Sequence, residues 1–374
     1  MIFTPQPEEG AAVYIHIPFC TTLCPYCHFF RVPPGPGDVE TYLEAVLKEA
    51  ASLRDMVPGH VRTVYVGGGT PSLLPASFYA RLFEAMDGVL PLDRVAEMSL
   101  EVDAGVDDEK LAQLAEAGFD RVSIGVKSFQ EHSIGVLGAG RWDGDRGMVV
   151  SRARAAGFSS VGIDLIYGFE GQGMDAFRAD LRTALAVGPD HISLYALEQN
   201  GDMGPREADG DLAAAMFRMA RRMLLAGGYG QYEICNFARP GHECLHNMNY
   251  WCDGDYFGLG PSAHSSLTVG GTRERFSNGP DLAGYLANPE GLRENLSSDA
   301  EENRAREALI LRLRLTQGVK VEEFTMRYGI DPLKILGADI DEFIQIGLMR
   351  AAPGRIRLTT RGMLLSNEIF ARII

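Results

Sequence analysis

The stretch YIHIPFCTTLCPYCHFF, residues 14–30, joins an apolar strand pattern to a loop that holds three of the chain's six cysteines. Cys20, Cys24 and Cys27 have the spacing C-x3-C-x2-C. The start of the chain lacks a basic segment followed by a long apolar one, so no secretory signal peptide is predicted. We therefore expect a cytoplasmic protein, in which thiols stay reduced and clustered cysteines bind metal or react.

The cysteine spacing favours an iron–sulfur cluster but leaves other kinds of site open. Three thiolates on one loop can bind three irons of a four-iron cluster and leave the fourth iron free for another ligand. A zinc ion needs a fourth protein ligand, which His16 or His28 would supply. A thioredoxin-like redox pair needs C-x-x-C at the start of a helix.

Outward from this stretch, short β-branched, apolar runs alternate with segments of helical periodicity. The runs lie at residues 13–17, 61–68, 96–103, 121–128, 161–168 and 191–198. Segments between them, such as DEKLAQLAEAG, repeat apolar residues at helical spacing. Alternation of this kind predicts a parallel sheet whose right-handed crossovers close it toward a barrel. Since a full barrel has eight units, the predicted fold is α/β, a partial (β/α)6 barrel.

The alternation stops after residue 230. We expect residues 1–230 to form the barrel and residues 231–299 to complete it as a strand, a long Gly-rich loop and a connector. Residues 300–374 predict three short helices and a β-hairpin, a winged-helix-like α+β domain. This last part has 12 Lys and Arg against 10 Asp and Glu, in a chain of net charge −15, so nucleic-acid binding is not expected.

Polar residues follow the predicted strands at the ends where a parallel barrel carries its chemistry. The cysteine loop follows the first strand, and GGGTP (67–71) follows the second. Glu101 and Lys127 come at the ends of the third and fourth strands, and Asp164 interrupts the apolar fifth strand. A candidate binding site is therefore predicted at this edge.

Together these motifs resemble the radical SAM superfamily and, within it, the HemN/HemW family. The motifs are YIHIPFCTTLCPYCHFF, YVGGGTPSLL, EMSLEVD, RVSIGVKSFQ, GIDLIYGFEGQ, HNMNYW and FGLGPSAHS. The resemblance implies a radical SAM barrel with a [4Fe–4S] cluster on Cys20, Cys24 and Cys27 and S-adenosylmethionine (SAM) on the open iron. It also implies an electron donor, such as flavodoxin or ferredoxin, for cleavage of SAM to a 5′-deoxyadenosyl radical. Net turnover of a substrate does not follow from it.

The resemblance further implies which residues lie at the SAM and cluster site. They are Tyr14, Tyr26, Gly67, Gly68, Gly69, Thr70, Glu101, Lys127, Arg141 and Asp164. Lys127 departs from the family, which usually has glutamine there, and lysine cannot accept a hydrogen bond. Structural roles are the alternatives for Glu101, as a rim charge, and for Asp164, as a hydrogen-bonded buried carboxylate.

The segment HNMNYW (246–251) is similar to the family's H-N-x-x-Y-W motif, which is associated with haem binding. It makes His246 the expected haem ligand, and a hydrogen-bonded loop anchor is the alternative reading. The family's oxidases carry a fourth cysteine two residues after the third and a long N-terminal arm, both absent here. The resemblance therefore implies a haem-binding protein that delivers haem to acceptor proteins, with a peripheral approach to membrane haemoproteins.

Three alternatives remain. CHFF (27–30) has some similarity to CxFF in haem-degrading relatives, which favours a class C radical SAM methyltransferase or haem-modifying enzyme that uses a second SAM. An oxygen-independent coproporphyrinogen III oxidase and a nucleic-acid-binding winged-helix protein are the others. Cys235, Cys244 and Cys252 are expected to be buried free thiols.

Overall fold

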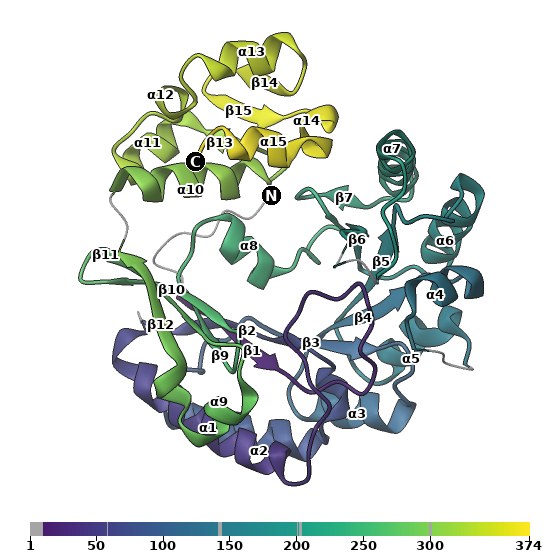
Figure 1. The fold of residues 1–374 in the computed structure, drawn as a ribbon, viewed down its shortest axis with the longest axis vertical. Helices are drawn as coiled ribbons and strands as arrows, with labels where there is room; N and C mark the ends of the chain where they lie inside the picture. The colour runs from purple at the N-terminus through teal and green to yellow at the C-terminus, as the bar shows by residue number, and fades with distance from the viewer. Residues whose placement is uncertain (1–9, 58, 141–143, 200, 202–203, 299–300) are drawn as a thin grey trace.

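The computed structural model describes residues 10–374 except 58, 141–143, 200, 202, 203, 299 and 300. Within these residues a twelve-stranded sheet is strongly curved, with most helices on its outer face, and a second, three-stranded sheet lies in a C-terminal unit (Figure 1). Among the described residues, no helix has both the length and the apolar character needed to cross a membrane.

Six parallel strands form the barrel wall in chain order. They are β1 (Ala11–Ile17), β2 (Val61–Gly68), β3 (Glu97–Asp103), β4 (Arg121–Lys127), β5 (Ser160–Tyr167) and β6 (His191–Ala196). The helices that connect them are α1 (Asp38–Leu53), α2 (Ala76–Asp87), α3 (Asp108–Glu116), α4 (Glu131–Leu137), α5 (Val149–Ala155) and α6 (Met174–Val187), with α7 (Gly210–Ala226) after β6. The predicted partial barrel of six strand–helix units is confirmed.

Successive side chains along each strand point alternately to the inner and the outer face of the barrel wall. On β3, Leu100 and Val102 belong to the main apolar core with residues of the surrounding helices. On the opposite face, Glu101 accepts a hydrogen bond from Tyr65 of β2, and Glu97 accepts hydrogen bonds from Cys244 and His246. Ser99, on the same face, is buried. The barrel interior is therefore polar, while its outer face packs against the helices.

The large sheet continues beyond both ends of the parallel part. At one edge, β9 (Tyr256–Leu259) pairs parallel with β1 and is followed by antiparallel β10 (His264–Val269), β11 (Thr272–Asn278) and β12 (Arg293–Ser298). At the other edge lie β8 (Asn236–Ala238) and β7 (Gly230–Gln231). The segment also contains α8 (Leu245–Trp251) and α9 (Leu282–Ala287).

The expected strand is present as β8 and the segment extends the large sheet, while the residues expected as one long loop and a connector also form α8, β9, β10, β11, α9 and β12. A Gly270–Gly271 turn with positive φ at both residues joins β10 to β11, as tight hairpins require. The predicted boundaries at residues 230 and 299 stay predictions.

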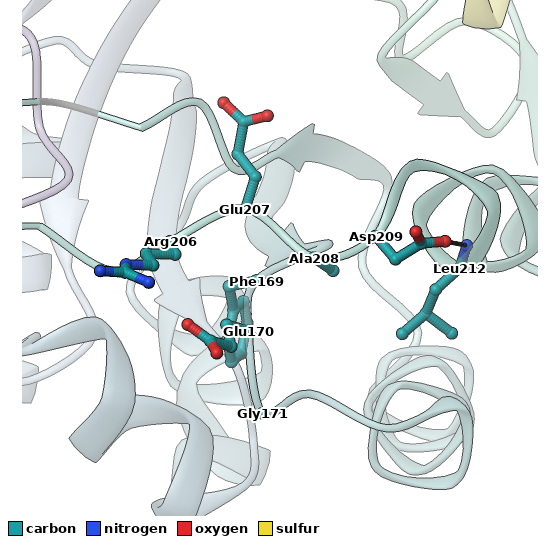
Figure 2. Close-up of a pocket in the computed structure, with 8 residues that line it drawn as sticks. All are labelled: Phe169, Glu170, Gly171, Arg206, Glu207, Ala208, Asp209 and Leu212. Atoms are coloured by element: carbon teal, nitrogen blue, oxygen red, sulfur yellow. Dashed lines mark hydrogen bonds between the residues drawn. The ribbon is translucent and has the colours of Figure 1, made fainter.

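A pocket of about 420 Å³ opens beside the end of β5 and the start of α7 (Figure 2). Glu170, Arg206 and Glu207 line it, and Asp209 caps α7 by accepting hydrogen bonds from the backbone of Asp211 and Leu212. No residue that the sequence predicts for the cofactor site lines this pocket.

The C-terminal unit begins with four helices, where the sequence predicted three. They are α10 (Glu301–Leu313), α11 (Val321–Tyr328), α12 (Pro332–Leu336) and α13 (Asp339–Gln345). Asp331 caps α12 and Gly337 ends it, which separates α12 from α13. The small sheet consists of β13 (Val319–Lys320), β14 (Met349–Ala352) and β15 (Arg355–Leu358), and α14 (Thr360–Leu364) and α15 (Ser366–Ala371) follow.

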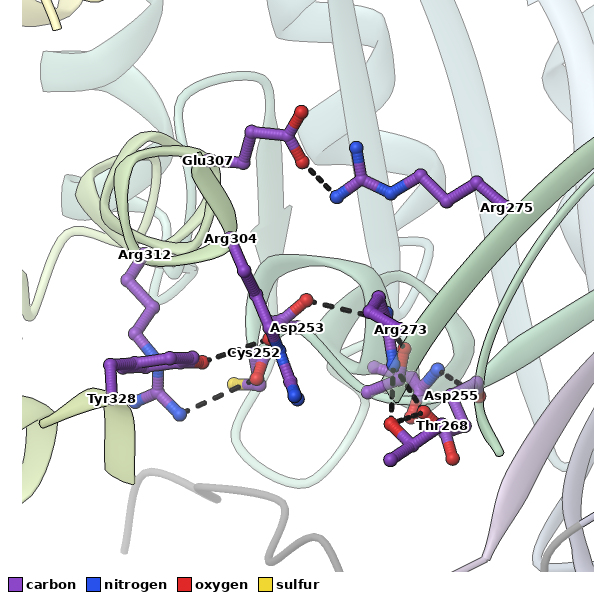
Figure 3. Close-up of polar contacts among 12 residues, drawn as sticks. Cys252, Asp253, Asp255, Thr268, Arg273, Arg275, Arg304, Glu307, Arg312 and Tyr328 are labelled. Atoms are coloured by element: carbon purple, nitrogen blue, oxygen red, sulfur yellow. Dashed lines mark hydrogen bonds and ion pairs between the residues drawn. The ribbon is translucent and has the colours of Figure 1, made fainter. Parts of the chain in front are cut away.

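Asp253, just after α8, joins the two parts (Figure 3). Its carboxylate pairs with Arg273 of β11 at 3.2 Å and accepts a hydrogen bond from the Tyr328 hydroxyl of α11 at 3.0 Å. Arg327 donates to the backbone oxygens of Cys252 and Asp253 at 3.0 and 2.7 Å. Since Asp253 and Arg273 are buried, these contacts hold the C-terminal helices against the edge of the large sheet.

Candidate functional site

The three clustered cysteines lie on the loop that follows β1. Cys20 is buried, whereas Cys24 and Cys27 are half-buried, and none of the three forms a disulfide. Cys20 Sγ lies 3.1 Å from Thr70 Oγ1, which connects this loop to the loop after β2. Burial raises the pKa of the Cys27 thiol, and the neighbouring Cys24 and Cys20 raise it further.

Arg31 fixes the shape of this loop, and the sequence reasoning missed it. Its guanidinium donates to the carbonyl oxygens of Cys24, Cys27 and Phe29 at 2.5, 2.8 and 3.0 Å. A guanidinium presents several donors in a rigid fork, so one side chain can hold three carbonyls. A basic residue four positions after the last of three clustered cysteines was the available signal.

Neither histidine near the cysteines is placed as a zinc ligand. His16 Nε2 bonds to the Phe30 carbonyl at 2.8 Å and Nδ1 to the Tyr14 hydroxyl at 3.1 Å, while burial lowers the pKa of His16 to about 4. His28 Nε2 lies 3.3 Å from the carbonyl of Glu198. Within the described residues, no three His, Cys, Asp or Glu side chains are arranged to hold a metal ion.

The glycine-rich loop after β2 packs directly on the start of the cysteine loop. The amides of Gly69 and Thr70 donate to the carbonyls of Ile17 and Phe19 at 2.7 and 2.8 Å. A Cβ at position 69 would lie 2.5 Å from the Phe19 oxygen, so only glycine permits this approach. The sequence-predicted Gly67, Gly68, Gly69 and Thr70 therefore lie beside the cysteines.

Glu101 is held inside the barrel by two hydrogen bonds. Its carboxylate accepts from the Tyr65 hydroxyl at 3.0 Å and from the Gly68 amide at 3.2 Å. Burial, and then the nearby Asp164 carboxylate, raise the pKa of Glu101 to about 7. The alternative of a solvated rim charge does not apply to this residue.

Asp164 lies across the interior on β5. It accepts a hydrogen bond from Ser123 of β4 at 3.0 Å, and burial raises its pKa. Lys127, at the end of β4, opposes that rise. The structure thus brings Glu101, Lys127 and Asp164 to neighbouring strands at one end of the barrel.

Two tyrosines flank this region from different sides. Tyr14 of β1 stacks with Tyr65, with ring centroids 6.3 Å apart. Tyr26, between Cys24 and Cys27, packs on an apolar cluster that includes Phe169 and Leu197. Arg141 lies outside the described residues.

His246, on α8, is buried at the opposite end of the barrel interior. Its Nδ1 lies 2.9 Å from Thr63 Oγ1 of β2 and its Nε2 lies 2.9 Å from the Tyr250 hydroxyl. Burial lowers the pKa of His246 to about 3. The structure does not bring His246 to the cysteines, but it stacks the imidazole on Tyr65, with centroids 5.1 Å apart.

Glu97, at the start of β3, holds α8 in this position. Its carboxylate accepts from the amides of Leu245 and His246 at 2.9 and 3.1 Å and from the Cys244 thiol at 3.4 Å. Sequence reasoning missed Glu97, Thr63 and Tyr65, although polar residues at every second position of β2 and β3 were a signal for them. Of the remaining cysteines, Cys244 and Cys252 are buried as expected, and Cys235 is half-buried.

Comparison with known proteins agrees with this arrangement. The family model described as the radical SAM superfamily matches residues 14–184, and the one described as the HemN C-terminal domain matches residues 299–365. The protein named heme chaperone HemW from Lactococcus lactis is 32% identical, over 98% of this chain and 98% of its own length. The chain belongs to the HemN/HemW family of radical SAM proteins.

Other members of the HemN/HemW family give the same picture. The heme chaperone HemW of Escherichia coli is 31% identical over 96% of both chains. The solved structure of the coproporphyrinogen III oxidase HemN from Escherichia coli is 23% identical and superposes with a TM-score of 0.83, covering 98% of this chain and 90% of that one. At this identity the superposition establishes the shared fold alone.

Membership of the radical SAM superfamily implies a [4Fe–4S] cluster and SAM. The chemistry of the donor set fits the cluster, because three cysteines share one loop and thiolates are the ligands that such clusters take. The neighbouring loop fits SAM, because glycines bring backbone groups close and Glu101 and Asp164 supply acceptors.

Proposed function

We propose that this chain is a haem-binding chaperone that also holds a [4Fe–4S] cluster and SAM, and that it passes haem to acceptor proteins, including ones at membranes. The observation that carries the proposal is similarity along nearly the whole chain to proteins named heme chaperone HemW. An electron donor such as flavodoxin or ferredoxin would reduce the cluster.

Cys20, Cys24 and Cys27 would hold the cluster, which when bound supplies one electron to SAM. Arg31 keeps the loop carbonyls of Cys24 and Cys27 in place, which limits the positions open to the thiols. Gly67–Thr70 would present backbone groups and a hydroxyl to the amino-acid part of SAM, near Tyr14 and Tyr26. Glu101, Asp164 and Lys127 would lie along its remaining polar groups, and Arg141 would complete the set.

His246 is the proposed haem ligand. A neutral imidazole is the form that binds iron, and the lowered pKa keeps His246 neutral at physiological pH. Ligation through Nε2 requires the Tyr250 hydroxyl to give up its hydrogen bond, while Thr63 continues to orient the ring through Nδ1. Binding would therefore include a local rearrangement at Tyr250.

A haem titration of the anaerobically reconstituted protein, followed by its Soret absorbance, tests this proposal. We expect saturable binding in the wild type and in H28A, which changes an exposed histidine on the cluster loop, and loss of the axial-ligand signature in H246A. Absence of saturable binding in the wild type contradicts the chaperone proposal. Equal spectra of wild type and H246A contradict the ligand assignment alone.

The second candidate is a class C methyltransferase or haem-modifying enzyme. The position of CHFF favours it, because His28 and Phe29 are exposed on the cluster loop, with His28 close to the end of β6. Mass spectrometry of porphyrins after incubation with haem, SAM and a low-potential reductant separates the two. A methylated or ring-opened porphyrin supports the enzyme, and intact haem retained on the protein supports the chaperone.

A further inference from the structure

Lys127 has a backbone conformation that side-chain-bearing residues seldom adopt. Its φ is 65°, in the left-handed region, and the pairing of β4 with β5 shifts register between Ile124 and Lys127. A bulge of this kind turns a side chain away from its regular direction, and bulges concentrate near binding sites. Such a conformation persists only where the surroundings hold it in place.

Asp180 of α6 supplies that support. Its buried carboxylate accepts hydrogen bonds from the Ser128 hydroxyl at 2.8 and 3.0 Å and from the Phe129 amide at 2.8 Å. The residues directly after Lys127 are therefore fixed to a helix on the outside of the barrel. The turn at Lys127 follows from this anchoring.

Gly125 provides the space into which the Lys127 side chain folds. A Cβ at position 125 would collide with Nζ of Lys127, so the ammonium occupies the place that any other residue at 125 would fill. Gly125 pairs with Asp103 of β3, and Lys127 pairs with Leu165 of β5. The ammonium thus lies on the interior side of β4, between the strands that carry Glu101 and Asp164.

The ammonium acts on both of these carboxylates. Lys127 lowers the pKa of Asp164 more than any other group does, and it also lowers the pKa of Glu101. Tyr65 donates to Glu101, and the hydroxyls of Ser123 and Ser193 hydrogen-bond Asp164. Tyr195 and the guanidinium of Arg121 are also close enough to act on Asp164. Lys127 is therefore the cation that acts on both half-buried carboxylates, whereas Arg121 acts on Asp164.

We propose that Lys127, held over Gly125, sets the charge selectivity of the SAM site. SAM carries a sulfonium, whereas S-adenosylhomocysteine has a neutral sulfur and is otherwise nearly the same molecule. A fixed ammonium beside the carboxylates reduces the negative potential that favours the sulfonium. With glutamine at position 127, the site would therefore prefer SAM over S-adenosylhomocysteine more strongly than it does with lysine. This inference rests on the proposed SAM site.

Equilibrium dialysis of both ligands against the reconstituted protein at pH 8.5, without reductant, measures the selectivity directly. The ratio of the dissociation constant of S-adenosylhomocysteine to that of SAM is expected to rise about fivefold in K127Q and K127M. G125A keeps the lysine but displaces its ammonium, so it should raise the ratio in the same direction. K334Q, at an exposed site on α12, should leave the ratio unchanged.

Two results overturn the inference. One is a ratio in K127Q and K127M within about twofold of the wild type. The other is a ratio that rises in K127Q but stays unchanged in a folded G125A, because the ammonium would then act from a position other than the space over Gly125. If the wild type binds neither ligand, the proposed SAM site itself fails, which is a separate outcome. Circular dichroism establishes that each variant is folded before its ratio is used.

Discussion

The ring of Tyr65 stacks on His246, with centroids 5.1 Å apart, while the Tyr65 hydroxyl donates to Glu101 at 3.0 Å. One side chain thus contacts the residue of the HNMNYW motif on one side and a carboxylate of the candidate SAM site on the other. The two motifs are far apart in the sequence but separated by a single tyrosine in the fold. Tyr65 therefore contacts both the proposed haem ligand and the candidate SAM site.

Glu101 should make the stability of the protein depend on pH. Its pKa in the folded state is about 7, above the ordinary value of 4.5, so its contribution is fully present below pH 4.5 and is lost as the pH rises toward 7. The free energy of unfolding of the wild type, relative to E101Q, should fall by up to about 3 kcal/mol across this range. Denaturant unfolding of both proteins at a series of pH values measures this fall.

E84Q is the matched control for that experiment, because Glu84 is exposed on α2. The difference between wild type and E84Q should stay constant across the same pH range. A constant difference between wild type and E101Q would show that Glu101 ionises normally in the folded state.

Arg31 should determine the affinity of the cysteine loop for iron. In R31A three loop carbonyls lose their donor, so the thiols gain freedom and iron affinity should fall about tenfold, as for other residues that orient metal ligands. Iron retained after dialysis against a chelator measures the change. R94A, which is largely exposed, is the control, and equal iron in R31A and R94A would refute the role.

Asp253 should be essential to the contact between the C-terminal helices and the large sheet. In D253N the buried Arg273 loses a charged partner, and Asn tolerates the φ of 54° at this position, so the change isolates the charge. We expect a loss of about 3 kcal/mol in the free energy of unfolding. Denaturation, together with limited proteolysis, tests this expectation.

The control for Asp253 is D175N, because Asp175 is almost fully exposed although it pairs with Arg178. D175N should unfold like the wild type. If D253N does so as well, the buried pair contributes little to the attachment of the C-terminal helices.

Asp180 should stabilise the turn that follows Lys127. D180N removes the charge that strengthens hydrogen bonds from Ser128 and Phe129, which should cost about 1–2 kcal/mol in the free energy of unfolding. Chemical denaturation of D180N beside D211N, a change at an exposed site on α7, measures this cost. Identical midpoints for the two variants would argue against the anchor.

Local patterns were enough to predict the six barrel strands and the edge where the cysteines, Gly67–Thr70, Glu101 and Asp164 gather. Strand periodicity is set by neighbours in the sequence, and parallel strands place their carboxyl ends at one edge of the sheet regardless of loop conformation. The seven-residue helix α8 was missed because LHNMNYW is too short to show helical periodicity and contains two asparagines, which are weak helix formers.

The direction of the Lys127 side chain could not be predicted, for a different physical reason. It depends on Asp180, in another strand–helix unit, and on the absence of a side chain at Gly125. Likewise, the role of Arg31 depends on which carbonyls the folded loop turns toward it. Contacts of this kind follow from tertiary packing and leave no periodic trace in the sequence.

The position of α8 depends on a set of contacts that is separate from those of the cysteine loop. Glu97 and Arg121 tie residues 242–246 across the amino ends of the strands, and α8 lies inside the curve of the sheet (Figure 1). The cysteine loop is instead held by Arg31 and by the amides of Gly69 and Thr70. A substitution can therefore loosen one of the two segments without removing a hydrogen bond of the other.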